Sequence, residues 1–182
     1  CLRAYAGSRQ SGKARADRLF RYLLICRGRH CILNQWQSFI SAIANETGID
    51  TKYVPIEITE SAAIDNANIK VLADKFHNNG FSLLVDDFGS GYSSLSTINM
   101  KCFDTLKIDK SLIDYIGDFS GERLLDHTIT LAKELGISVT AEGVETKKQV
   151  DFLTRLNCDN IQGFYYSKPL CVGDFNQLLG SC

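Results

Sequence analysis

The chain has 182 residues, 45% of them hydrophobic, with 20 basic and 21 acidic side chains and a formal net charge of −1. This length and composition predict one domain with a buried core and exclude a disordered chain, and no apolar run approaches the ~20 residues of a membrane-spanning helix. The seven cysteines include no Cys-x-x-Cys pair, which favours free, mostly structural thiols in a reducing, cytoplasmic compartment.

The basic side chains are concentrated at the start of the chain. Residues 1–31 hold eight basic residues and one acid and carry about +7, whereas residues 32–182 carry about −8. No motif supports a nucleic-acid-binding arm, and we expect no nucleic-acid polymer as a partner. The segment also lacks a clean helix or strand period. We therefore expect residues 1–33 to be an atypical basic segment from a truncation, a frameshift or a junction with unrelated sequence, and the domain proper to occupy residues 34–182.

Strands and helices are expected to alternate from residue 34 onward. Short apolar runs predict strands at residues 54–58, 81–85, 105–108, 137–141 and 160–164. Apolar residues at helical spacing predict helices at residues 36–48, 61–80, 120–136, 146–156 and 175–179. Ser61 and Ser120 are the expected caps of two helices, and Thr146 with Gln149 predicts a capping box. This alternation indicates a parallel sheet with helical crossovers, and five strands make only part of a (β/α) barrel.

Polar side chains mark the ends of these strands. In chain order they are Glu57, the pair Asp86 and Asp87, Lys107 with Asp109, Glu142 and Gln162. The C-terminal ends of the strands form one face of a (β/α) barrel, and that face carries the active site. We therefore expect these side chains to line a common site.

The chemistry of this set points to a hard metal ion. Carboxylates without a His or Cys cluster favour Mg²⁺ or Mn²⁺ over zinc, and a divalent ion relieves their mutual repulsion. Two such ions suit the in-line attack of water on a phosphodiester. Lys107 could take a proton from the attacking water if neighbouring cations lower its pKa, or could otherwise neutralise charge on the phosphate.

The run from Asp86 to Leu95 is the strongest single motif. Gly89 and Gly91, two residues apart, permit a tight loop directly after the acid pair. A loop in this place can act as a mobile gate over the site.

Five groups of residues in order carry a family resemblance. They are Glu57-Ile58-Thr59-Glu60-Ser61, the run Asp86–Leu95, Leu106-Lys107-Ile108-Asp109-Lys110-Ser111, Ala141-Glu142-Gly143-Val144-Glu145-Thr146, and Gln162-Gly163-Phe164 with Ser167-Lys168-Pro169-Leu170 behind it. With these motifs the chain resembles the EAL-domain family of cyclic-di-GMP phosphodiesterases over residues 35–180. The resemblance implies an α/β, TIM-like (β/α) barrel, here incomplete at its N-terminus. It also implies hydrolysis of cyclic-di-GMP to linear pGpG with Mg²⁺ or Mn²⁺.

The resemblance also assigns roles to individual residues. The acids expected to hold metal are Glu57, Asp86, Asp87 and Glu142. Lys107 resembles the proposed general base, and Glu142 is its expected catalytic partner. The residues expected to steady the gating loop or support the site are Glu60, Gly89, Ser90, Gly91, Asp109 and Glu145. Gln162 is expected to line the substrate site.

Two family motifs are missing from this sequence. The Glu-Ala-Leu motif is absent, and an alignment on Arg29 puts Ile25, which cannot bind metal, where the family has the Asn of its Asn-x-Ser motif. Two hypotheses therefore stand: a metal-dependent phosphodiesterase, or an inactive module that binds cyclic-di-GMP or a protein partner. Missing strands would leave edges of the sheet without backbone partners, and the pairing of two such edges could give a homodimer.

Overall fold

The structure, a computed structural model, describes residues 2–4, 8–9, 22–26, 40–42, 44–46, 48–64, 69–90, 102–171, 174–175 and 177. One eight-stranded sheet runs through them in the order β1-β3-β4-β5-β6-β7-β8-β2. Its strands are β1 (Leu2–Ala4), β2 (Ser8–Arg9), β3 (Tyr22–Cys26), β4 (Ile56–Thr59), β5 (Leu83–Phe88), β6 (Thr105–Ile108), β7 (Ser138–Ala141) and β8 (Asn160–Ile161). The six strands from β3 to β8 are parallel to one another, which confirms the α/β class and the parallel sheet.

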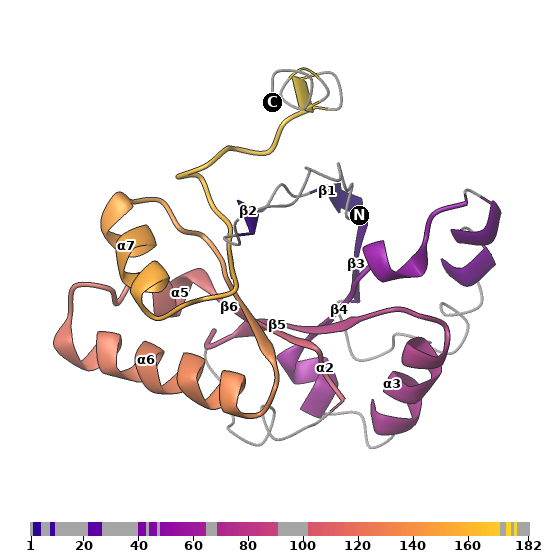
Figure 1. The fold of residues 1–182 in the computed structure, drawn as a ribbon, viewed down its shortest axis with the longest axis horizontal. Coiled ribbons are helices and arrows are strands. Elements are labelled where there is room, and N and C mark those ends of the chain that lie inside the picture. Colours follow the sequence, from indigo (N-terminus) through magenta and orange to yellow (C-terminus); the bar gives the residue numbers. More distant parts are fainter. Residues whose placement is uncertain are drawn as a thin grey trace.

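Helices cover the outer side of this curved sheet (Figure 1). They are α2 (Glu60–Ile64), α3 (Ile69–Asn78), α5 (Lys110–Ile113), α6 (Phe119–Glu134) and α7 (Lys147–Arg155). A short 3₁₀ helix, η1 (Thr51–Tyr53), precedes β4. The described residues of 40–46 are also helical, as are those of 174–177. Within the described ranges, no helix is both long enough and apolar enough to span a membrane.

Helix starts differ from the sequence prediction at two places. Ser61 was expected to cap a helix, but α2 already begins at Glu60, directly after β4. Ser120 was expected to open α6, but Asp118 caps it by accepting a hydrogen bond from the Gly121 backbone nitrogen. An Asp accepts this bond as well as a Ser does, so the choice between two nearby caps depends on the path of the preceding loop.

Successive residues along each strand face opposite sides of the sheet, so apolar side chains enter the core and the polar side chains between them face the site. Ile56 and Ile58 are fully buried in the hydrophobic core beneath the helices, whereas Glu57 between them belongs to the opposite face of β4. The same pattern recurs on β6, where Leu106 and Ile108 enter the core and Lys107 lies between them. The apolar face therefore packs against helices, while the other face carries the polar side chains.

Three strands come from the basic N-terminal segment, where the sequence predicted none. Strand β3 lies parallel to β4, and β1 and β2 pair antiparallel with β3 and β8 at the two ends of the sheet. Residues Ala4 and Ser8 are four positions apart, so the chain can separate them by at most roughly 14 Å. The two ends of the sheet are thus tied together, and the sheet curls toward a barrel.

Candidate active site

The expected site residues meet at the C-terminal end of the parallel strands. Glu57 lies on β4, Asp86 on β5 and Lys107 on β6, while Glu142 and Gln162 directly follow β7 and β8. Because parallel strands end at the same edge of the sheet, residues from five separate stretches of sequence converge there.

Lys107 is the centre of this group. Its ammonium group pairs with the Glu57 carboxylate, with Asp86 Oδ1 at 2.8 Å and with Glu142 Oε1 at 2.5 Å. Lys107, Glu57 and Asp86 are almost entirely buried, and the Glu142 side chain is 20% exposed. Three carboxylates thus surround one cation, which leaves an excess of negative charge in a place with little water.

One buried oxygen of this cluster, Glu57 Oε2, accepts no hydrogen bond from the residues that the structure describes. Ligand atoms of Glu57, Asp86 and Glu142 lie within 4.8 Å of one another. A buried polar atom without a partner is costly, and a divalent cation would satisfy it. Three carboxylates are also the hard oxygen donors that Mg²⁺ and Mn²⁺ prefer, so the residues present fit such an ion.

The two glutamates of the cluster, Glu57 and Glu142, have raised pKa values that favour their protonated forms. Burial raises the pKa of Glu57 to about 7, with the negative charge of Asp86 adding to the effect and Lys107 opposing it. Burial likewise raises the pKa of Glu142. Burial alone would lower the pKa of Lys107, but the charges of Glu142, Glu57 and Asp86 together raise it, so Lys107 is a cation at neutral pH.

Gln162 and Asp87 interact with the acid cluster through Glu142. Gln162 Nε2 donates a hydrogen bond of 2.7 Å to Glu142 Oε1, which orients that carboxylate. Asp87 is partly exposed and adopts a positive φ of 59°, and its charge contributes to the raised pKa of Glu142. It therefore lies near the cluster but outside the group of three acids.

The residues expected to form or steady the gating loop lie directly after β4 and β5. Glu60 is buried at the first residue of α2. The Gly89 carbonyl accepts a hydrogen bond from Ser111 Oγ at 3.3 Å, and the Ser90 backbone nitrogen donates to the Asp87 carbonyl. Gly91 lies outside the described residues. The first turn of the predicted gating loop is therefore tied to α5.

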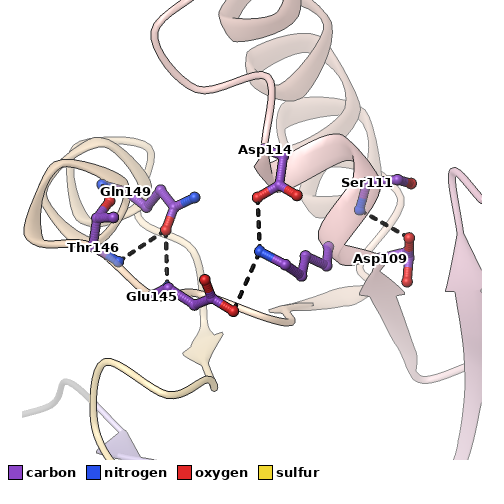
Figure 2. Close-up of polar contacts among 7 residues, drawn as sticks. Asp109, Ser111, Asp114, Glu145, Thr146 and Gln149 are labelled. Atoms are coloured by element: carbon purple, nitrogen blue, oxygen red, sulfur yellow. Dashed lines mark hydrogen bonds and ion pairs between the residues drawn. The ribbon is translucent and has the colours of Figure 1, made fainter.

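Asp109 and Glu145 belong instead to the rim, by which we mean the exposed and half-exposed residues at the starts of α5 and α7 (Figure 2). Asp109 caps α5 by accepting a hydrogen bond from the Ser111 backbone nitrogen at 2.9 Å. Glu145 pairs with Lys110 at 3.4 Å. Lys110 was given no role on sequence grounds, although its spacing from Lys107 equals the spacing of Glu145 from Glu142.

Strand β3 brings an apolar residue to the level of the acids. In the parallel pairing of β3 with β4, Ile25 is in register with Glu57. The place next to Glu57 on the neighbouring strand is thus taken by a residue that offers no metal ligand.

Comparison with known proteins gives a consistent family. The EAL domain model matches residues 29–169. Over 130 residues the chain is 38% identical to the probable cyclic di-GMP phosphodiesterase PdeG of Escherichia coli (strain K12), a match covering 71% of this chain and 24% of PdeG. The chain therefore spans about a quarter of the length of that curated relative.

Solved structures agree with the sequence match. The EAL domain of Mycobacterium smegmatis DcpA superposes with a TM-score of 0.80 and 30% identity, over 87% of this chain and 72% of that chain. A manganese and cyclic-di-GMP complex of Klebsiella pneumoniae BlrP1 superposes with a TM-score of 0.68 and 29% identity, over 72% of this chain and 34% of that chain. At least one similar EAL protein thus holds a divalent cation together with the cyclic dinucleotide.

Proposed function

The chain belongs to the EAL-domain family, and we propose that it is a phosphodiesterase domain that hydrolyses cyclic-di-GMP to linear pGpG with Mg²⁺ or Mn²⁺. The observation that carries this proposal is the group of Glu57, Asp86 and Glu142 around Lys107, in which one buried Glu57 oxygen has no hydrogen-bond partner among the described residues. Such an arrangement is costly for folding alone, and cation binding compensates for it. The substrate is proposed from the relatives, whose names and complexes refer to cyclic-di-GMP.

In this proposal four acids hold the metal. Glu57, Asp86 and Glu142 form the buried part of the site, and Asp87 supplies a more exposed carboxylate beside them. Bound there, Mg²⁺ or Mn²⁺ would supply Lewis acidity for the phosphoryl oxygens and acidify the attacking water. Gln162 keeps Glu142 oriented through its 2.7 Å hydrogen bond.

Lys107 is proposed to act on the reacting phosphodiester. Its three acidic neighbours raise its pKa, so in the metal-free protein it holds its proton. We assign it first to neutralising negative charge on the phosphoryl group. It would act as a general base only if neighbouring cations lowered its pKa.

The loop and rim residues have supporting roles in the same proposal. Glu60, Gly89, Ser90 and Gly91 belong to the gating loop and its anchor, and Asp109 and Glu145 hold the segments that carry Lys107 and Glu142. The proposed domain occupies residues 34–182.

A second candidate function is a non-catalytic module that binds cyclic-di-GMP. The register of Ile25 with Glu57 favours it, because the residue that pairs with Glu57 on β3 is of a type that cannot bind metal. A site with fewer ligands can still bind a nucleotide while it fails to hold two metal ions in the geometry that hydrolysis needs.

The deciding experiment is product formation from cyclic-di-GMP in the presence of Mn²⁺. Wild-type protein is compared with Lys107→Ala and Asp86→Ala, and with Asp151→Ala as a control on the exposed face of α7. Linear pGpG that disappears in the two site variants and persists in the control supports the phosphodiesterase. Binding of cyclic-di-GMP by folded wild-type protein without product supports the binding module instead.

A further inference from the structure

Two lysines and two glutamates pair across the same two segments with the same spacing. Lys107, near the end of β6, pairs with Glu142 at 2.5 Å, and Lys110, three residues later, pairs with Glu145 at 3.4 Å. The first pair lies in the acid cluster. The second lies on the rim, where the side chains of Lys110 and Glu145 are 43% and 44% exposed. The two pairs join the β6–α5 segment to the β7–α7 segment at two points.

The aliphatic part of the Lys110 side chain lies against Gly143, the residue that follows Glu142. A Cβ atom added to Gly143 would lie 2.6 to 2.9 Å from Cβ, Cγ and Cδ of Lys110. Gly143 also has a φ of +66°, a conformation that side-chain-bearing residues rarely adopt. Gly143 therefore provides the close approach that lets Lys110 lie against the loop carrying Glu142.

Both segments joined by the Lys110–Glu145 ion pair are held by further hydrogen bonds (Figure 2). Asp114 accepts a hydrogen bond of 2.9 Å from Lys110 one turn along α5. On the other side, Gln149 Oε1 accepts hydrogen bonds from the backbone nitrogens of Glu145 and Thr146 at 2.9 and 3.0 Å. The ion pair thus connects the start of one helix to the capped start of another.

We propose that Lys110 is a positioning residue that holds Glu142 in the acid cluster. It acts through its stem on Gly143 and its ammonium group on Glu145, and Glu142 is fixed between this contact and Lys107. The part of this inference that concerns metal affinity rests on the proposed function, whereas the part that concerns the order of residues 142–146 does not.

A metal titration tests the link to the site. Manganese alone is titrated calorimetrically into wild-type protein, Lys110→Met, Lys110→Arg and Lys147→Met. Lys147 pairs with Asp151 at 2.8 Å and i,i+4 spacing, as Lys110 does with Asp114 at 2.9 Å, and so provides a matched control. Exposed ion pairs of this kind contribute less than about 1 kcal/mol of stabilisation. Lys110→Met should therefore raise the Mn²⁺ dissociation constant ~2- to 5-fold. Lys110→Arg should restore it, and Lys147→Met should leave it unchanged.

Amide hydrogen exchange of the metal-free protein provides the second measurement. Lys110→Met should speed exchange at Glu145 and Thr146, and also at Glu142, whose backbone nitrogen donates to the Ile108 carbonyl. Exchange that is unchanged, or equally fast in Lys147→Met, overturns the proposal. Faster exchange with an unchanged Mn²⁺ affinity also overturns it, since Glu142 would then not depend on Lys110.

The two measurements separate the failure of this inference from that of the function. If the wild-type protein binds no Mn²⁺, the proposed metal site is wrong. The hydrogen exchange of residues 142–146 then decides alone whether Lys110 holds that segment.

Discussion

Burial and neighbouring charge have opposite effects on the Lys107 ammonium group: burial disfavours the charged form, and the three carboxylates favour it. Placing one ammonium group among three carboxylates with little water is expensive, and removing the cation would leave the acids without compensation. The arrangement therefore lowers the stability of the metal-free protein, the loss of Lys107 would lower it further, and a bound divalent cation would offset the cost.

Replacing Lys107 tests this balance directly. We expect Lys107→Met to lower the free energy of unfolding of the metal-free protein by ~3–5 kcal/mol at pH 8, because buried carboxylates then repel one another. The loss should shrink at pH 5, because Glu57, whose pKa is about 7, is then protonated. Denaturant unfolding at the two pH values measures both effects, and Lys147→Met should change the free energy by less than about 0.5 kcal/mol. A Lys107→Met protein as stable as wild type at pH 8 would show that the acids are not ionised together.

The raised pKa of Glu57 predicts how stability changes with pH. The folded protein holds this proton up to a pKa of about 7, whereas the unfolded chain releases it near the ordinary value of 4.5. The folded state binds the proton more tightly, so its contribution to stability is complete below pH 4.5 and is lost as pH rises to about 7. The loss is at most ~3 kcal/mol, because each pKa unit corresponds to about 1.4 kcal/mol.

Urea unfolding of metal-free protein between pH 4.5 and 8 measures this dependence. Glu57→Gln should remove most of the decline, since an amide does not titrate. A decline that is equally steep in Glu57→Gln assigns the proton to another group, and the account of Glu57 is then wrong.

The sequence predicted some site residues better than others. Glu57, Asp86, Lys107, Glu142 and Gln162 could be grouped in advance because parallel strands share one end, and the structure brings them together. The contacts of Lys110 could not be predicted, because they depend on how α5 and the loop after β7 approach each other. The repeated spacing of three residues was the only signal in the sequence.

At the scale of elements, local chemistry set some boundaries and tertiary contacts set others. The capping box of Thr146 and Gln149 is present as predicted, because both of its hydrogen bonds are made within four residues. Helix α5 was missed, since four residues with an Asp cap give too short an apolar pattern to detect. The start of α6 moved to Asp118 because two suitable caps stand close together in the sequence.

Gly143 permits a matched test of one connection between elements. Gly143 and Gly136 both have a positive φ, of 66° and 77°, but an added Cβ meets nothing within 4 Å at Gly136 and meets the Lys110 stem at Gly143. Gly136→Ala should therefore cost only the ~1 kcal/mol of a left-handed residue with a side chain. Gly143→Ala should cost more and should also weaken Mn²⁺ binding, because Glu142 is the preceding residue.

Thermal unfolding and Mn²⁺ titration of the two variants provide the comparison. Equal losses of stability with equal Mn²⁺ affinity would mean that the loop after β7 adjusts to the added methyl group without moving Glu142.

For the fold as a whole, the question is whether the N-terminal segment belongs to the domain. The composition of residues 1–33 suggested material foreign to the domain, yet β3 continues the parallel sheet and β1 and β2 pair with its two ends. The strands were missed because none of these short segments shows a clean alternation of apolar and polar residues. In parallel sheets, burial on both faces weakens that alternation further.

Deleting residues 1–9 tests whether this segment belongs to the fold. The deletion removes β1 and β2 and leaves one edge of β3 and one edge of β8 without backbone partners. Unpaired strand edges are open to pairing with another chain, so we expect a lower midpoint of thermal unfolding and concentration-dependent self-association. Light scattering and calorimetry measure the two effects, and Mn²⁺ affinity should change little because Glu57, Asp86 and Glu142 remain. If the shortened protein is as stable and as monomeric as the full chain, the pairing of residues 2–9 contributes nothing, and the interpretation of the N-terminus as unrelated sequence gains support.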